Sequence, residues 1–246
     1  FFKAQEYLEG FDPTSPIAIR GNALLQAHQA TIHYIKKEYE QADQIARQML
    51  LIGKEQSDTL LMLAGGELVA NVYVVKGMID AYIELKEKSY QLNQTYSDKT
   101  LFYRSILDGL LNAYIFKGGY EDRVWELLLE MHDSQKYEAE SYLNFAQLIT
   151  YSQNPDSTAQ QIFEKFDIAN MDELSALFIT NASERLNQNQ LYHLHYEIAK
   201  AYAKLGKPEI ALTVLDDAIV IIKNVYSSEL AESLAEYEKL KVEKEE

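Results

Sequence analysis

Four asparagines lie in stretches whose apolar spacing predicts helices: Asn71, Asn112, Asn144 and Asn181. A side-chain amide carries both a donor and an acceptor, so it can hydrogen-bond the N–H and C=O groups of an extended peptide backbone. Asparagine is a middling helix former, so several in mid-helix call for a reason. We therefore treat the four as candidate contacts to a peptide main chain. The alternative is that each is solvated or bonded to a neighbouring helical turn.

Tyrosine is the second residue type that could serve binding, because the chain contains 18 of them. A tyrosine ring offers apolar area with a polar tip. Tyr73, Tyr103 and the basic Arg104 join the asparagines as candidate peptide contacts. The same predicted helices carry further tyrosines at Tyr114, Tyr142, Tyr151, Tyr192 and Tyr196. The alternative is packing between helices, which we favour for Tyr114 and Tyr202, and solvation for Arg104.

The sequence has no pattern that indicates a metal site, a reactive thiol or an enzyme active site. His28 and His33 are five apart and His193 and His195 are two apart, whereas a helical zinc pair needs an i, i+4 spacing. The chain has no cysteine, which removes thiolate nucleophiles, thiolate metal ligands and disulfides. No nucleophile-elbow, phosphate-loop, dinucleotide or kinase motif is present. The sequence therefore predicts a non-enzymatic protein with no metal and no cofactor.

The elements that must position these side chains are predicted to be helices. The chain has only four prolines and ten glycines, and apolar residues between them recur at spacings of 3 and 4, as in 105–116. Ser15 before Pro16 is an N-cap with a proline at the first helical position. Asn170 with Glu173 has the spacing of a capping box. The pattern predicts an all-α fold of about a dozen helices joined by short turns.

The stretch 191–224, LYHLHYEIAKAYAKLGKPEIALTVLDDAIVIIKN, has the pattern of a repeat built from two antiparallel helices. Its small residues let the helices approach closely, its large residues fill the gaps, and its glycine and proline end one helix and start the next. These positions are Ala199, Ala211, Ala218, Tyr202, Leu215, Gly206 and Pro208. The unit strongly resembles a tetratricopeptide repeat (TPR).

Degenerate versions of the unit recur along the chain. The positions that match the first small residue of the second helix are 42, 81, 123, 159 and 211, so the intervals are 39, 42, 36 and 52. A regular TPR array steps by about 34 residues. The interval of 52 leaves room for an extra helix at about 171–187. We predict a right-handed α-solenoid of about five helix pairs, with a C-terminal capping helix in the charged tail 229–246.

This drifting spacing resembles the repeat domains of peptide-pheromone receptors of Gram-positive bacteria, the PlcR, Rgg and Rap group; MalT-like regulators are a second family with similar spacing. Beyond 191–224 the resemblance is architectural. It implies a short linear peptide in a concave groove lined by the first helix of each pair. In the DNA-binding members it also implies an N-terminal helix-turn-helix domain. The start at Phe1 without Met indicates a trimmed piece, and 1–14 is too short for such a domain.

The net charge of the chain limits the classes of partner that it is expected to bind. The formal net charge is −15, and 101–246 carry 13 basic and 25 acidic side chains. Such a field repels nucleic acid and anionic membranes, and no apolar run reaches the ~18 residues of a membrane span. We expect 1–14 to be an N-terminal helix and linker remnant, and 15–246 to be the TPR-like repeat domain.

The predicted function is peptide or protein-segment binding, as the ligand-sensing part of a cytoplasmic transcriptional regulator of the quorum-sensing type. Homodimerisation is left open, and direct contact of this segment with nucleic acid or membrane is not expected. The alternative is a TPR scaffold or adaptor that binds a folded protein partner.

Overall fold

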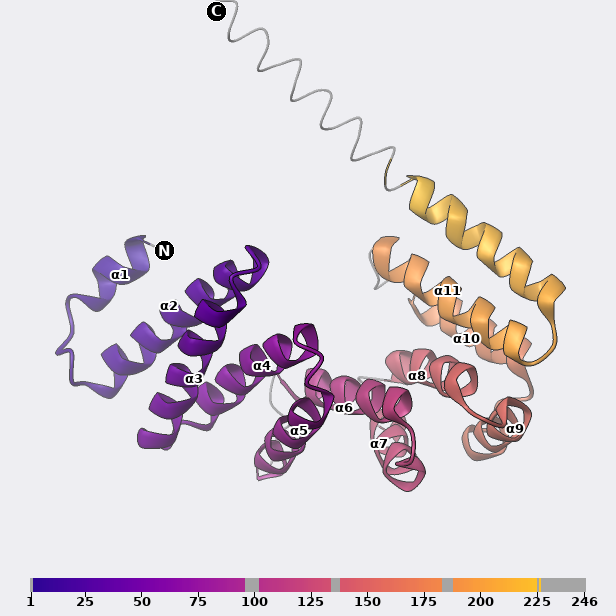
Figure 1. The fold of residues 1–246 in the computed structure, drawn as a ribbon, viewed down its shortest axis with the longest axis horizontal. Helices are drawn as coiled ribbons and strands as arrows, with labels where there is room; N and C mark the ends of the chain where they lie inside the picture. Colours follow the sequence, from indigo (N-terminus) through magenta and orange to yellow (C-terminus); the bar gives the residue numbers. More distant parts are fainter. Residues whose placement is uncertain (1, 96–101, 134–137, 183–187, 225, 227–246) are drawn as a thin grey trace, which may run out of the picture. The chain divides into compact units, whose positions relative to one another are not determined.

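The computed structural model describes residues 2–95, 102–133, 138–182, 188–224 and 226 (Figure 1). Every regular element in these ranges is a helix, which confirms the all-α prediction. The helices are α1 (Phe2–Leu8), α2 (Pro16–Ile35), α3 (Tyr39–Glu55), α4 (Thr59–Val75), α5 (Ile79–Gln94), α6 (Tyr103–Lys117), α7 (Glu121–Asp133), α8 (Glu138–Tyr151), α9 (Pro155–Phe166), α10 (Met171–Ala182), α11 (Gln188–Lys204) and the helical segment 208–224.

Within the described ranges, consecutive helices can be grouped into five pairs that follow the predicted repeat positions. The pairs are α2 with α3, α4 with α5, α6 with α7, α8 with α9, and α11 with 208–224. The extra helix expected at about 171–187 is α10, which packs against α8 and α11. The fold is thus an all-α repeat solenoid. The predicted capping helix over 229–246 lies outside the described residues.

The chain divides into two compact units, Phe1–Tyr114 and Ile115–Glu246. The boundary falls inside α6, so this helix contributes to both.

In the first unit, glycines allow α3 and α4 to approach closely. Gly65 lies in α4, where an added Cβ would come within 2.9 Å of the backbone nitrogen of Leu50. Gly53 lies inside α3, where a Cβ would come within 2.7 Å of the backbone nitrogen of Met62. Both glycines therefore serve helix contact. Beside them lies a core cluster of Ala23, Met49 and Leu61.

In the second unit, α8 packs against its partner α9 and also against α7, α10 and α11. Phe145 of α8 is fully buried, with its ring centroid 4.4 Å from that of Phe166. The small residues Ala211 and Ala218 are buried, in agreement with the close approach predicted for the last pair. Tyr202 is buried too and donates its hydroxyl hydrogen bond to Asp172 (2.7 Å), which joins α11 to α10.

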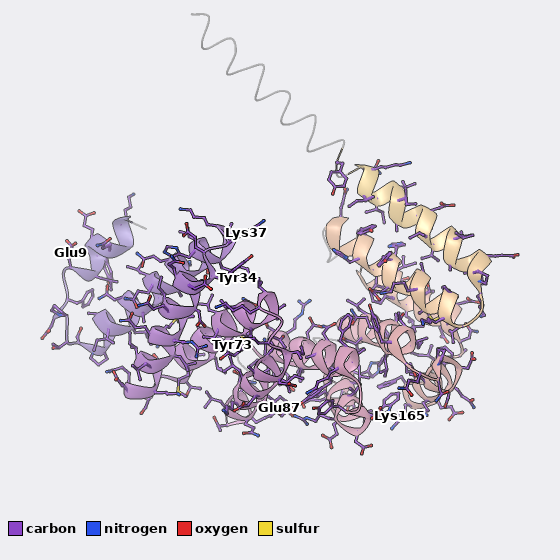
Figure 2. The ribbon with its side chains drawn as sticks, in the orientation of Figure 1. Glu9, Tyr34, Lys37, Tyr73, Glu87 and Lys165 are labelled. Carbon is purple, nitrogen blue, oxygen red and sulfur yellow. The ribbon has the colours of Figure 1, made fainter. Side chains whose placement is uncertain are left out.

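The turns inside several pairs need one residue in the left-handed conformation. Gly77, Gly118 and Gly206 have φ values of 67°, 70° and 69°. In the first pair the equivalent residue is Lys37 (Figure 2), with φ 63°, where the repeat pattern would place glycine. A side chain is unfavourable in this conformation, so the turn of the first pair carries a local strain that the other three avoid.

Candidate functional site

The four candidate asparagines occupy different environments. Asn71 is exposed on α4. Asn112 is half-buried, and its Nδ2 donates to the carbonyl of Asp108 one turn earlier (2.8 Å). Asn144 has none of its surface exposed. Asn181 belongs to α10, but its side chain lies outside the described part of the chain. In this conformation only Asn71 among the three described side chains presents a largely exposed amide.

The other predicted contacts also differ in accessibility. Tyr103 is buried, with 2% of its surface exposed, whereas Arg104 is exposed. Tyr73 (Figure 2) is half-buried, and its hydroxyl accepts a hydrogen bond from Nη2 of Arg47 (3.0 Å). Hydrogen bonds to Asp43 first and Tyr73 second raise the pKa of the Arg47 guanidinium. The peptide-binding role of these residues stays a prediction.

Aromatic side chains from three first helices meet in the second unit and form what we call the aromatic–lysine row. Its members are Phe116 at the end of α6, Tyr151 at the end of α8, and Tyr192, Tyr196 and Lys200 on α11. The ring centroids of Phe116 and Tyr151 are 4.5 Å apart, and those of Tyr192 and Tyr196 are 6.0 Å apart at an interplanar angle of 22°. Nζ of Lys200 lies 4.6 Å from the Tyr151 ring and 5.2 Å from the Tyr196 ring, and so joins the two ring pairs.

The row is open to solvent. Phe116 is 61% exposed, Tyr151 38% and Tyr196 39%, although each has a large apolar ring. Adjacent exposed rings of this kind mark interaction surfaces more often than single exposed side chains do. The row can therefore offer several ring faces to a ligand.

Hydrogen bonds fix the position of the Lys200 ammonium group in the row. Nζ of Lys200 donates to the hydroxyl of Tyr151 (2.6 Å) and contacts both carboxylate oxygens of Glu197 (3.0 and 3.1 Å). Partial burial lowers the pKa of Lys200, but the bonds to Tyr151 and Glu197 outweigh it, so the net pKa is raised and the ammonium stays charged. Since the Tyr151 oxygen accepts from Lys200, its own proton is left for an acceptor.

Sequence reasoning found part of this row. It placed Tyr151, Tyr192 and Tyr196 on first helices and left their role open, and it did not single out Phe116 or Lys200. The available signal was the i, i+4, i+8 spacing on α11, which puts its two tyrosines and the lysine on one face. Which side chains of α6 and α8 lie next to that face depends on how the helices pack.

A second lysine–tyrosine cluster lies in the first unit and is buried. Nζ of Lys86 contacts both carboxylate oxygens of Glu67 (2.8 and 2.7 Å) and the carbonyl of Ser105 (3.1 Å). The side chains of Lys86 and Glu67 are only 5% and 14% exposed. Burial, followed by the negative charge of Glu67, raises the pKa of the neighbouring Tyr82. The cluster joins α4, α5 and α6 and offers little surface to a ligand.

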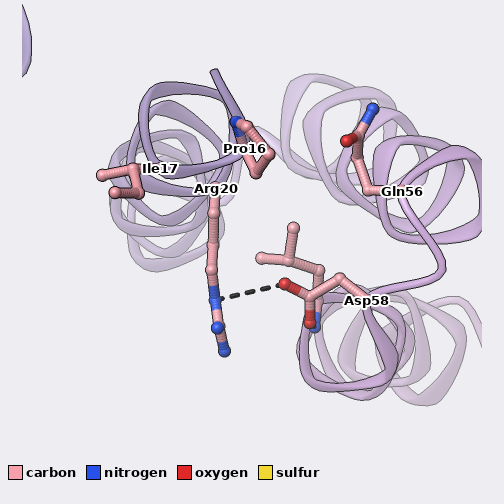
Figure 3. A pocket seen from close by; sticks show the side chains of 6 residues that line it. Pro16, Ile17, Arg20, Gln56 and Asp58 are labelled. Carbon is pink, nitrogen blue, oxygen red and sulfur yellow. Dashed lines mark hydrogen bonds and ion pairs between the residues drawn. The ribbon is translucent and has the colours of Figure 1, made fainter. Parts of the chain in front are cut away.

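The first unit also contains a pocket of about 270 Å³ beside the start of α2 (Figure 3). Nε of Arg20 lies 3.1 Å from Oδ2 of Asp58. The other oxygen of Asp58 accepts from the backbone N–H of Leu61 (3.1 Å) and so caps α4. The charged groups of the pocket are therefore already paired with each other or with a helix end. The lining residues are Pro16, Ile17, Arg20, Gln56, Asp58 and Leu61.

The described ranges contain no group of three or more histidines and carboxylates arranged to hold a metal ion. Among the helices of the same ranges, none has the length and apolar character needed to cross a membrane.

Comparison with solved structures identifies the fold. A single-substitution variant of nearly identical TPR-like repeats attributed to a kinesin light chain of Podosopora anserina covers 84% of this chain and 97% of its own, with a TM-score of 0.62 at 16% identity. The same repeats without that substitution give 0.59 at 17% identity, over 83% of this chain and 96% of theirs. BtubC (BKLC) from P. vanneervenii gives 0.55 at 18% identity, over 92% and 89%.

These structures show that the chain has a TPR-like repeat fold, and at such identities they show the fold alone. No protein-family model and no curated protein sequence matches the chain. The narrower resemblance to peptide-pheromone receptors stays a prediction.

Proposed function

We propose that this chain is a non-enzymatic binding module that holds an extended segment of a partner protein on the aromatic–lysine row. The observation that carries the proposal is the set of adjacent, exposed rings of Phe116, Tyr151 and Tyr196 around the charged Lys200. Tyrosine supplies rigid contact area at a low cost in side-chain entropy. Contacts of this kind provide much of the energy of protein interfaces.

The kind of segment is narrowed by shape and charge. The row crosses three helices, so an extended chain can contact several rings in succession. Residues 101–246 carry 25 acidic and 13 basic side chains, and this field favours a neutral or basic segment over an acidic one.

The wider proposal is that this module senses a peptide for a cytoplasmic transcriptional regulator. In such a protein, ligand binding would alter the packing of the repeats or of a dimer, and with it the activity of an attached domain. The peptide-facing set predicted from sequence would then extend the site. These residues are Asn71, Asn112, Asn144, Asn181, Arg104, Tyr73 and Tyr103.

An adaptor that binds a folded partner is the second candidate. It is favoured by the exposed apolar side chains of α2, among them Ile17 (60% exposed) and Ile35 (72%). An adaptor that used α2 would keep its partner when the aromatic–lysine row is removed.

Selection from a displayed library of random short peptides, followed by calorimetry, tests the first candidate. We expect the selected peptides to lose at least about tenfold in affinity with Tyr196→Ala or Phe116→Ala, as for a central aromatic contact. Leu212→Ala is the matched control, because Leu212 is 63% exposed in the same unit but lies on the second helix of its pair. Equal affinities for all three variants and the unchanged chain would contradict the proposal.

A further inference from the structure

The aromatic–lysine row has polar groups suited to a ligand that accepts hydrogen bonds. The Tyr151 hydroxyl has its proton left to donate, since its oxygen accepts from Lys200. The carboxylate of Glu197, which is the acceptor beside the row, is bonded through both oxygens to Lys200. The row therefore offers hydroxyl groups to a peptide, while its one charged acceptor, the Glu197 carboxylate, is held by Lys200.

An ordinary extended peptide has more N–H groups than this surface has acceptors. Each of its residues other than proline presents one N–H donor as well as one C=O acceptor, and both need partners when water is displaced. The tyrosine hydroxyls of the row can accept as well as donate, but they are too few to serve an N–H group on every residue of an extended segment. Of the predicted amides in the second unit with a described side chain, Asn144 has no exposed surface.

A proline-rich segment in the polyproline II conformation matches the row better. Proline has no N–H, so its main chain offers acceptors only. The polyproline II helix has no internal hydrogen bonds, so its carbonyls are available to hydroxyl donors. Its proline rings pack on aromatic side chains, which is how proline-rich segments bind aromatic-lined surfaces.

The solvent exposure of the row also favours a polyproline II ligand. Rings that are 38–61% exposed form a shallow surface, where affinity depends on keeping the entropic cost of binding low. A polyproline II segment is ordered before it binds, so it loses less conformational entropy than a flexible peptide. The acidic field of 101–246 adds a preference for neutral or basic flanking residues.

We infer that the occupant of the aromatic–lysine row is a proline-rich, neutral or basic segment of a partner protein, bound as a polyproline II helix. This inference rests on the proposed function and adds the chemical class of the ligand.

The test is the affinity of the whole chain for three synthetic peptides of equal length, measured by calorimetry. One is oligoproline with a lysine at each end, the second replaces the prolines with alanine, and the third replaces the lysines with glutamate. We expect the first to bind at least about tenfold more tightly than the second and several-fold more tightly than the third. Its affinity should fall about tenfold with Tyr196→Ala and remain unchanged with Leu212→Ala.

Two results would overturn the inference in distinguishable ways. If the oligoproline and alanine peptides bind equally, while library-selected peptides still depend on Tyr196, the row binds peptides and the polyproline II assignment is wrong. If neither oligoproline nor any selected peptide loses affinity with Tyr196→Ala and Phe116→Ala, the proposed function fails together with the inference.

Discussion

The two units contain the same trio of side chains in opposite surroundings. In the first unit Lys86 pairs with Glu67 and lies 5.6 Å from the ring of Tyr82, and the lysine side chain is 5% exposed. In the second unit Lys200 pairs with Glu197 beside a tyrosine ring, and its side chain is 28% exposed. A lysine, a glutamate and tyrosine rings thus build a core contact in one unit and a candidate ligand surface in the other.

The difference arises from what covers each trio. In the first unit α6 closes over Lys86, because Ser105 accepts from its ammonium and Gly109 has no side chain to keep the helices apart. In the second unit the row lies where α6 and α8 end, and Phe116 and Tyr151 remain exposed there. Burial therefore decides whether this set of residues serves stability or recognition.

Breaking the buried pair should have the largest effect on stability. Lys86→Ala leaves Glu67 charged and without its lysine in a buried site, so we expect a loss of about 3–5 kcal/mol in the free energy of unfolding. Urea denaturation followed by circular dichroism measures it. Lys88→Ala is the control: Lys88 lies on the same helix, is 67% exposed and pairs with Glu84 on the surface, so no measurable change is expected. Similar losses for both variants would contradict the account.

Adding a side chain at Gly109, next to Lys86 and Tyr82, should cause the second-largest loss of stability. In Gly109→Ala the new Cβ would clash with the Tyr82 hydroxyl and lie 3.0 Å from Cε of Lys86, so we expect a loss of about 1–3 kcal/mol by overpacking. Adding Tyr82→Phe removes the clashing oxygen and should recover part of that loss in the same denaturation assay. If the double variant loses the sum of the two single effects, the clash is not the cause.

A change beside the exposed lysine of the second unit should affect ligand binding more than stability. Tyr196 is 39% exposed, so removing its ring should lower the free energy of unfolding by about 1–2 kcal/mol, less than Lys86→Ala does. The affinity for peptides should fall at least about tenfold, because the ring provides contact area at the interface. Denaturation and calorimetry on the same sample separate the two effects. A large loss of stability would show that the ring is part of the core.

A turn in the first unit gives the smallest expected change, and one of opposite sign. Lys37 has φ 63°, so Lys37→Gly should relieve strain and raise the free energy of unfolding by about 0.5–1 kcal/mol. The neighbouring Lys36 has φ −74°, so Lys36→Gly gains no such relief and should be neutral or destabilising. Thermal unfolding of the two variants side by side measures the difference. A change of the same sign in both variants would show that the backbone at Lys37 is not strained.

The fold followed from sequence because its determinants are local. The small residues Ala199, Ala211 and Ala218 predict two closely packed helices, and Gly206 predicts the turn between them. Neither prediction depends on the sequence of the neighbouring repeats. The interval of 52 residues between the last two repeat positions predicted a helix where α10 is found. Lys37 lies where the repeat pattern has glycine, and its backbone has the left-handed conformation that glycine adopts in the other turns.

The site was harder to predict because it depends on which faces of the helices meet. Asn112 and Asn144 have equivalent sequence signals, yet one bonds to its own helix and the other is fully buried in the packing of α8. Phe116 and Lys200 come close to Tyr151 only through the packing of three helices that are separated by tens of residues. A one-dimensional spacing holds no information on that packing.

The most direct test of the central claim is the affinity of one library-selected peptide for the unchanged chain, Tyr196→Ala and Leu212→Ala. We expect a dissociation constant at least about tenfold higher for Tyr196→Ala and an unchanged one for Leu212→Ala. The same dissociation constant for all three proteins would show that the aromatic–lysine row does not bind the peptide.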